Sequence, residues 1–151
     1  MNMKENIFKD FSFGAIVFSQ KNDELKFLLV QMKDGHISFP KGHPQDNEKI
    51  PETVKREIFE ETGLTKFKLF DDYSFISNYQ FEKDGKMIDK TSTYYLAEYI
   101  DGEIDIQIPE EIIHCQWYSF DEALNAITYK NDKDNLILAK NKIKLLFNNL
   151  N

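Results

Sequence analysis

The chain has 151 residues, of which 41% are hydrophobic, and carries 26 acidic against 19 basic side chains, a formal net charge of −7. This length and composition predict one folded domain over residues 1–151, and the negative charge disfavours long nucleic acids, whose binding depends on Lys and Arg at the phosphates. The single cysteine excludes an internal disulfide, and the lack of an apolar run of about 20 residues or of a signal peptide predicts a cytoplasmic protein without a membrane partner.

The first half of the chain contains two strand-like segments, a loop and one helix. Residues 11–19 and 25–32 are rich in Phe, Ile, Val and Leu, a composition typical of strands. Residues 35–47 form a predicted loop, because Pro and Gly interrupt any regular element. A helix is predicted over residues 51–62, since Pro suits the first helical position and Gly63 suits the residue just past a helix end.

The second half begins with a predicted β-hairpin. Residues 69–81 and 87–100 are strand-like, and the short polar link between them contains an Asp-Gly pair, which favours a tight hairpin turn. Three isoleucines then alternate with polar residues at positions 104, 106 and 108. We expect a further half-buried strand there.

The remaining residues predict one more strand followed by two helices. Residues 112–119 form the strand, and Ser-Phe-Asp-Glu over residues 119–122 matches a capping box, which predicts a short helix from that point. A last helix over about residues 134–148 places its apolar side chains on one face. This order predicts an α/β (α+β) fold with a mixed β-sheet between helices.

Three glutamates converge on one side of the helix predicted over residues 51–62. Glu57 and Glu61 are four residues apart and Glu60 lies beside them, next to the apolar stripe. Like charges at this spacing destabilise a helix by roughly a few tenths of a kcal/mol per pair, and a divalent cation would remove that cost. Mg²⁺ takes a few carboxylates together with waters and phosphates. A cation site and a salt-bridged surface helix are the two interpretations that these residues allow.

Nine positions in residues 42–64 resemble the Nudix box. The pattern is Gly, five residues, Glu, seven residues, Arg-Glu, an aliphatic residue, any residue, Glu-Glu, any residue, Gly and an aliphatic residue. The residues at these positions are Gly42, Glu48, Arg56, Glu57, Ile58, Glu60, Glu61, Gly63 and Leu64. The resemblance implies the Nudix fold, an α/β/α sandwich around a mixed β-sheet. It also implies Mg²⁺-dependent cleavage of a nucleoside diphosphate linked to another group, with Mn²⁺ as a possible substitute.

The resemblance also implies roles for the residues of the box. The metal ligands would be Gly42, through its carbonyl oxygen, with Glu57, Glu60 and Glu61. Glu48 and Arg56 would support the glutamates, since the fixed fork of an Arg can hold neighbouring carboxylates in place. The metal would polarise phosphoryl oxygens and lower the pKa of a bound water.

Segments outside the box are similar to the diadenosine-tetraphosphate hydrolases that release ATP and AMP. These segments are residues 27–31, 34–35, 39–43, 90–91, 94–98 and 111–117. The similarity would place Lys41, His43 and Lys90 near the phosphates, and it would stack Tyr79 on adenine. Glu111 would be a further metal ligand or catalytic base outside the helix. The alternatives are that Tyr79 only packs in its strand and that Glu111 is a solvated loop acid.

The chain departs from the common pattern just before the first glutamate of the box. Asn47 stands where many relatives have Gly, and because Asn tolerates a left-handed backbone the turn can survive. Pro44 and Gln45 replace a common Val-Glu pair, which removes an acid from the expected metal surroundings. This second departure weakens the substrate assignment more than the fold assignment.

The first functional hypothesis is a hydrolase of dinucleoside polyphosphates, whose partner is a small nucleotide. A Nudix pyrophosphatase acting on a nucleoside triphosphate or capped RNA is the alternative within the enzymes. A noncatalytic nucleotide-sensing domain is the alternative of another class, and it is disfavoured because such domains commonly lose glutamates that this chain keeps. His36 and His114 are expected to be structural or exposed, and Cys115 to be packed. The sequence does not indicate an oligomeric state.

Overall fold

The computed structural model describes residues 7–147 and contains three α-helices and seven strands within that range. The strands are β1 (Ile7–Ser19), β2 (Lys26–Met32), β3 (Ile37–Ser38), β4 (Lys41–Gly42), β5 (Lys66–Lys83), β6 (Lys86–Asp101) and β7 (Ile112–Ser119). The helices are α1 (Ile50–Thr62), α2 (Phe120–Ala126) and α3 (Lys130–Phe147), and a short 3₁₀ turn, η2, spans Lys21–Asp23.

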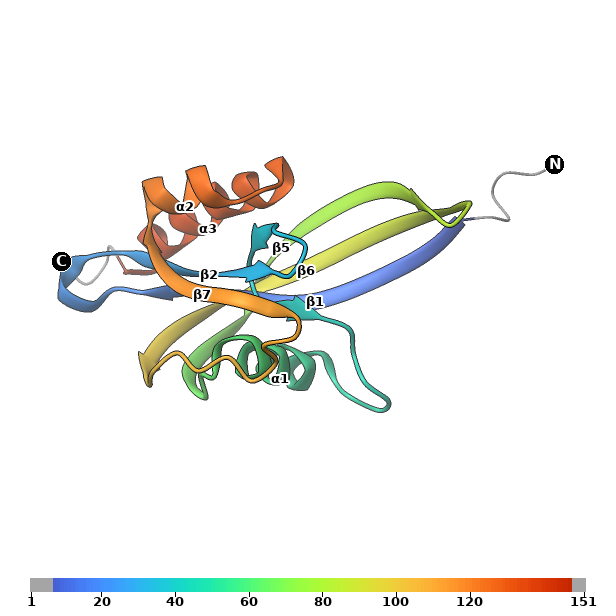
Figure 1. The fold of residues 1–151 in the computed structure, drawn as a ribbon. Coiled ribbons are helices and arrows are strands. Elements are labelled where there is room, and N and C mark those ends of the chain that lie inside the picture. Colours follow the sequence, from blue (N-terminus) through green and yellow to red (C-terminus); the bar gives the residue numbers. More distant parts are fainter. Residues whose placement is uncertain (1–6, 148–151) are drawn as a thin grey trace.

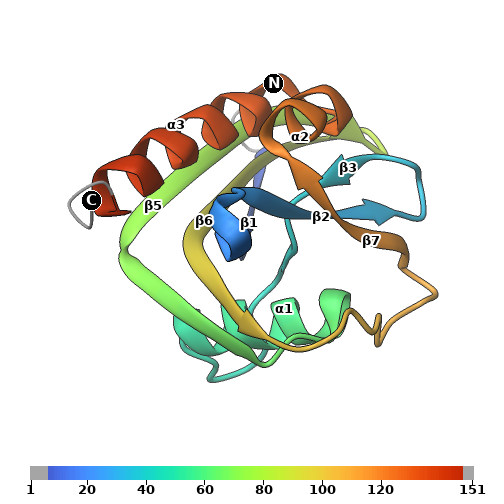
Figure 2. The same ribbon diagram turned by 90° about the vertical axis from the view of Figure 1, so that its left-hand side faces the viewer.

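One mixed sheet lies between two layers of helices. The strand order is β3-β2-β1-β6-β5, with β4 paired to β1 and β7 paired to β2. Helix α1 covers one face, whereas α2 and α3 cover the other (Figure 1). Seen from the side, the sheet curves strongly between these layers (Figure 2). The predicted α+β architecture is therefore present, and no helix in residues 7–147 is long and apolar enough to span a membrane.

The central strand β1 is apolar on both of its faces. It pairs with β6 in parallel and with β2 and β4 in antiparallel orientation. Ile16 and Phe18 pack into the core beneath α2 and α3, while Ala15 and Val17 pack into the core beneath α1. Burial on both faces explains why this stretch lacks polar alternation.

The predicted hairpin is confirmed as β5 and β6. Asp84 and Gly85 at its turn have φ angles of 53° and 75°, the left-handed conformations that a type I′ turn requires. Together with the start of β1, the two strands extend beyond the helical layers (Figure 1). Both strands are longer than the sequence predicts, because pairing continues past the residues that are buried.

The strand predicted around Ile104, Ile106 and Ile108 is wrong. The isoleucines are half-buried, as their alternation indicates, but residues 102–111 contain no strand. Their backbone instead bonds to the end of α1: the N–H of Asp105 donates to the Thr62 carbonyl and that of Gln107 to the Glu60 carbonyl, each at 2.9 Å. The free carbonyls at the end of a helix accept hydrogen bonds from the N–H groups of this segment, which therefore needs no neighbouring strand.

Most other predictions of elements are close to the structure. The loop at residues 35–47 contains the two-residue strands β3 and β4. Helix α1 begins one residue early and ends as predicted, with Gly63 left-handed at φ 81°. The capping box of α2 is confirmed. Helix α3 begins four residues before the predicted start, and the predicted end at residue 148 lies outside the described residues.

Candidate active site

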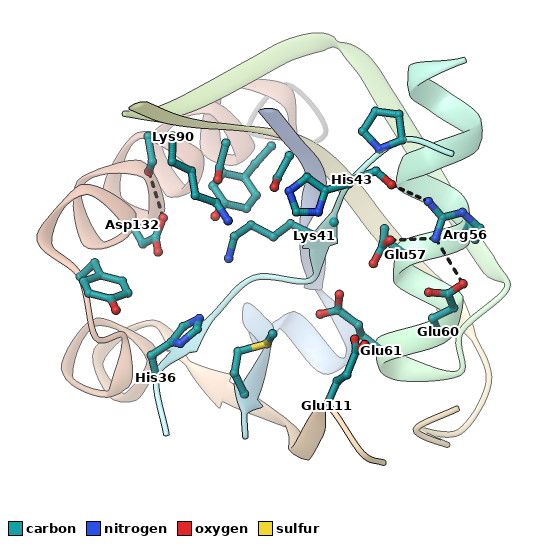
Figure 3. Close-up of a pocket in the computed structure, with 18 of the residues that line it drawn as sticks. His36, Lys41, His43, Arg56, Glu57, Glu60, Glu61, Lys90, Glu111 and Asp132 are labelled. Atoms are coloured by element: carbon teal, nitrogen blue, oxygen red, sulfur yellow. Dashed lines mark hydrogen bonds and ion pairs between the residues drawn. The ribbon is translucent and has the colours of Figure 1, made fainter. Parts of the chain in front are cut away.

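A cavity of about 500 Å³ lies between α1 and the start of α3, over the face of the sheet (Figure 3). It gathers residues from positions 12 to 132 of the chain. Its acidic and basic side chains are His36, Lys41, His43, Arg56, Glu57, Glu60, Glu61, Lys90, Glu111 and Asp132. Its other lining residues include Gly42, Ser77, Tyr79, Ser92, Tyr94 and Tyr129. All predicted site residues except the supporting Glu48 therefore line one space.

Helix α1 supplies the acidic wall of the cavity. Glu57 and Glu61, one turn apart, are buried with exposed fractions of 7% and 3%, whereas Glu60 is partly exposed. Val54 and Ile58 on the adjoining stripe anchor the helix to the sheet beneath it. Packing of this apolar stripe thus turns the two carboxylates toward the cavity rather than toward solvent.

Arg56 links the acids of the helix to the preceding loop. Its guanidinium donates twice to Glu48, at 2.7 and 3.0 Å, and also to Glu57 at 2.8 Å, to Glu60 at 3.2 Å and to the His43 carbonyl at 2.8 Å. Paired and bidentate charge-assisted bonds of this kind fix both partners. This geometry matches the supporting role expected of Arg56.

Glu48 is held as a carboxylate by the same contacts. Arg56, the backbone N–H of Gln45 and the Thr53 hydroxyl all donate to it. These hydrogen bonds, with that from Arg56 the largest cause, lower the pKa of Glu48 to about 2. Asn47, which replaces the usual Gly here, adopts φ 63°, so its tolerance of the left-handed region preserves the turn, as predicted.

Glu61 and Glu57 form a crowded pair of carboxyl groups. Burial, together with hydrogen bonding and charge from Glu57, holds the pKa of Glu61 well above its usual range. Gly42 packs so closely that a Cβ built on it would collide with the Glu57 carboxylate. The Gly42 backbone and two buried carboxyl groups thus meet at one point.

These oxygen donors suit a divalent cation of the Mg²⁺ type. Two buried carboxyl groups close together provide the negative charge that such a cation compensates. In the described part of the chain no three or more His, Cys, Asp and Glu side chains are already close enough to form a ligand cluster. Arg56 binds one carboxylate oxygen of Glu57 and one of Glu60, which leaves the second oxygen of each group unused by Arg56.

Glu111 comes from the turn before β7 and lies on the same side of the cavity as Glu61 (Figure 3). The backbone of this turn is fixed, because the Glu111 carbonyl accepts from the Lys33 N–H at 2.9 Å and the Glu111 N–H donates to Ile108 at 3.0 Å. The turn therefore presents a fourth acidic side chain to the cavity.

The basic side chains lie between the acidic wall and α3. Lys41 is deeply placed, and burial lowers the pKa of its ammonium group, while the charge of Asp132 opposes that effect. His43 and Lys90 share Asp10: the His43 ring lies 2.6 Å and the Lys90 ammonium 3.7 Å from its carboxylate. Asp10 was not among the predicted site residues.

An aromatic pair lies at the side of the cavity next to α3. Tyr79 of β5 and Tyr129, which precedes α3, have ring centroids 5.9 Å apart and an interplanar angle of 24°. His36 packs against Tyr129 at 5.6 Å and is bonded to Asp34. His36, which was expected to be structural or exposed, also contributes to the lining of the cavity. His114 is exposed, as expected.

Sequence reasoning missed Tyr129 and Asp132 altogether. Both lie at the start of α3, which the sequence placed four residues too late. Asp132 is 5% exposed and lines the cavity. The polar run Lys-Asn-Asp over residues 130–132 is compatible with an earlier helix start, but it does not indicate that Tyr129 and Asp132 face the cavity.

The NUDIX domain family matches this chain over residues 9–139. The chain belongs to the Nudix family. A mouse protein named bis(5′-nucleosyl)-tetraphosphatase (asymmetrical) is 33% identical to it over 133 residues, which cover 82% of this chain and 88% of that protein. The rat protein of the same name is also 33% identical over 133 residues. The chain is thus a Nudix hydrolase.

Solved structures confirm the Nudix fold. A Caenorhabditis elegans Ap4A hydrolase in a binary complex superposes with a TM-score of 0.78 at 22% identity, covering 89% of this chain and 97% of the other. The matched NUDIX span contains α1 and every residue that lines the cavity. The cavity therefore belongs to the Nudix domain itself.

Proposed function

We propose that this Nudix hydrolase uses Mg²⁺ to cleave dinucleoside tetraphosphates asymmetrically, converting diadenosine tetraphosphate to ATP and AMP. The observation that carries the proposal is the order of groups across one cavity: glutamates at one side, Lys41, Lys90 and His43 in the middle, and a pair of tyrosines at the other. The names of the mouse and rat relatives support the same substrate class.

The acidic side is where the cation would be held. The ligands proposed for it are Glu57, Glu60, Glu61 and the Gly42 carbonyl, with Glu111 as a further acid from the facing turn. The chemistry that a divalent cation supplies when bound is polarisation of phosphoryl oxygens and activation of water. Arg56 fixes Glu57 and Glu60 in their directions, and its own charge is held in turn by Glu48.

The basic side chains suit a chain of several phosphates. Lys41, His43 and Lys90 all line the cavity, between the acidic wall and Asp132 (Figure 3). Donors with positive charge make shorter and stronger hydrogen bonds to phosphate than neutral ones do. Asp10, which now contacts His43 and Lys90, would give up these contacts as phosphates take its place.

The tyrosine pair suits a nucleobase. Tyr79 and Tyr129 present nearly parallel rings at the edge of the cavity, and a base stacked on such a ring gains roughly 1–3 kcal/mol. This arrangement supports the stacking role expected of Tyr79 and adds Tyr129 to it. A base held there directs its phosphates toward Lys41 and Lys90.

A product assay tests the proposal directly. The protein is incubated with diadenosine tetraphosphate and Mg²⁺, and the products are separated by ion-exchange chromatography. Equal amounts of ATP and AMP are expected, and two equivalents of ADP would show symmetrical cleavage instead. No turnover with either Mg²⁺ or Mn²⁺ would rule the proposal out, and a panel with nucleoside triphosphates and capped RNA ranks kcat/KM among substrates.

Glu61→Gln tests the acidic side of the cavity. The substitution keeps the shape of the side chain but removes one charge, so we expect kcat to fall by about a hundredfold or more. The matched control is Glu52→Gln, because Glu52 is exposed on the same helix and lies outside the cavity. Both variants should unfold at a temperature close to that of the wild type, and near-normal turnover of Glu61→Gln would contradict the metal role.

A further inference from the structure

The end of the cavity near α3 has a polar floor built around Asp132. The Ser38 hydroxyl donates to one of its carboxylate oxygens at 2.8 Å, and the Ser77 hydroxyl donates to the other at 2.9 Å. Asn135 donates in turn to the Ser77 oxygen at 2.9 Å. The four side chains are nearly fully buried, and nothing in the Nudix box accounts for them.

All hydrogens in this network point toward the carboxylate. Asn135 donates to Ser77, and each serine donates its single hydroxyl hydrogen to Asp132. A carboxylate offers about four acceptor positions, of which these serines use two. Because Asp132 also lines the cavity, what it presents there is acceptor capacity only.

A buried hydroxyl without a partner lies next to this floor. Ser92 is 1% exposed, lines the cavity, and its hydroxyl oxygen has no hydrogen-bond partner among residues 7–147. Tyr94 also lines the cavity, and burial, together with the charge of Asp132 and a hydrogen bond to it, holds the pKa of its hydroxyl well above the usual range. Unpartnered buried polar groups are costly, so a ligand that completes these bonds would be favoured.

The tyrosine pair places a stacked base directly over this floor. Ser77 and Tyr79 are two residues apart on one face of β5, a separation of roughly 7 Å along a strand. Tyr129 is just before the first turn of α3, and its carbonyl accepts from the Asp132 N–H at 3.1 Å. A base on the tyrosine rings therefore has one polar edge within reach of Asp132.

The acidic wall lies at the opposite side of the cavity. Figure 3 shows Asp132 and Glu57, Glu60 and Glu61 facing each other across it, with Lys41 and Lys90 between them. A nucleotide bound with its base at Asp132 thus has its phosphates on the lysines and its reacting end at the glutamates.

We propose that Asp132 is a specificity-determining residue that selects guanine over adenine as the base held in this cavity. The inference rests on the proposed function, because it concerns the nucleoside end of the same substrate. Enzymes commonly identify a stacked base through its Watson–Crick edge. Guanine presents two adjacent donors there, the N1–H and the N2 amino group, which complement the acceptor-only carboxylate of Asp132.

Adenine fits the same floor less well. Its Watson–Crick edge has one donor, the N6 amino group, beside the N1 acceptor, whose lone pair would face a carboxylate oxygen. The neighbouring hydroxyl of Ser92 supplies a donor for the O6 carbonyl of guanine, which adenine lacks. Sites built for a hydrogen bond reject analogues that cannot make it.

Ligands that differ by single groups test the inference without altering the protein. Isothermal titration calorimetry in EDTA would compare GDP, IDP and ADP, where IDP keeps the N1–H of GDP but lacks its amino group. We expect the order GDP, IDP, ADP, with about tenfold or more between the first and last, within the discrimination of one bidentate base contact. Equal affinities, or tighter binding of ADP, would overturn the inference.

Asp132→Asn is the matching change in the protein. An amide presents one acceptor and one donor, the complement of the adenine edge, so the preference should reverse toward ADP. It can still accept from one serine and donate to the other, which preserves the network. Asp134→Asn is the control, since Asp134 is exposed on the same helix, pairs with Lys130 and does not line the cavity. A merely structural role for Asp132 would change stability without changing the ratio of GDP to ADP affinity.

Turnover separates this inference from the proposed function. Wild-type kcat/KM should be higher for diguanosine than for diadenosine tetraphosphate, and Asp132→Asn should reduce or invert that ratio. Hydrolysis of both at equal kcat/KM would overturn the guanine preference and leave the proposed function intact. Hydrolysis of neither would overturn the proposed function, while the GDP, IDP and ADP series still decides the base preference.

Discussion

Two glycines near the cavity are close to different kinds of neighbour. A Cβ built on Gly42 would collide with the carboxylate of Glu57, the end of a side chain that can turn away. A Cβ built on Gly14 would collide with the Pro40 carbonyl and lie 2.7 Å from the Lys41 Cα, both of which are backbone atoms. The same substitution should therefore have two different consequences.

Gly42→Ala should impair activity, whereas Gly14→Ala should impair folding. Displacing Glu57 breaks its 2.8 Å bond to Arg56, and a misplacement of about 1 Å in a catalytic group can cost about a hundredfold in kcat. Overpacking against backbone should instead reduce the free energy of unfolding by about 1–3 kcal/mol. Urea denaturation and steady-state kinetics on both variants check this, and equal destabilisation of the two would contradict it.

At the residue scale, the sequence predicted the acidic side of the cavity better than the side proposed to hold the nucleobase. Glu57, Glu60 and Glu61 lie on a single helix, so helical spacing alone places them together. Tyr129 and Asp132 reach the cavity only because α3 packs across the sheet, a long-range contact that no local pattern encodes. Prediction from sequence is accordingly strongest where one element carries the whole group.

At the element scale, short helix α2 depends on the capping box at its start. The Ser119 hydroxyl accepts from the Glu122 N–H at 3.2 Å, and Glu122 accepts from the Ser119 N–H at 2.9 Å. Such reciprocal bonds satisfy two backbone donors that a helix leaves free. Because α2 contributes Ala123 to the core beneath it, loosening this helix should weaken the whole fold.

Ser119→Ala should lower the free energy of unfolding by about 1 kcal/mol, the usual cost of removing a capping hydroxyl. Turnover should be unchanged, since neither Ser119 nor Glu122 lines the cavity. Glu122→Gln serves as the control, because Gln also completes a capping box. Chemical denaturation of the three proteins measures the free energy of unfolding. An equal decrease in both variants would mean that the charge of Glu122 matters as much as the capping hydroxyl.

Local signals also explain which elements were predicted. The cap of α2 and the left-handed Gly63 are encoded within a few residues, and both were found. The alternation of Ile104, Ile106 and Ile108 reports half-burial faithfully, but it does not identify what the backbone bonds to. Alternation therefore predicts a face of the chain more reliably than it predicts a strand.

At the scale of the whole molecule, acidic and basic side chains occupy different parts of one cavity, although the chain has a net charge of −7. The acids of α1 and Glu111 lie on one side, and Lys41, His43 and Lys90 lie between them and α3. A bound cation would offset charge on the acidic side, while the lysines attract phosphate. An acidic protein can thus bind an anionic substrate, because the net negative charge of the whole chain does not describe the charge inside the cavity.

Ionisation of the Cys115 thiol affects the stability of the whole fold at alkaline pH. It lies on β7, where burial, with the charge of Glu61, raises the pKa of its thiol to about 12 from 9.0. Between these values the unfolded chain loses a proton that the folded chain keeps. The contribution of this thiol to stability is therefore complete below pH 9 and decreases as the pH rises toward 12.

Cys115→Ala removes this proton and should flatten the decline. We expect the wild type to lose up to about 1.4 kcal/mol of unfolding free energy per pH unit more than the variant above pH 9, the amount for one proton. Urea denaturation of both proteins at pH 8, 9 and 10 measures the difference, since the titrating lysines and tyrosines are common to both. Folded Cys115 should also react slowly with a thiol reagent at pH 9, because the thiolate is the reactive form, and should react quickly in urea. A difference in stability that stays constant with pH would mean that the thiol ionises as readily in the folded chain as in the unfolded one.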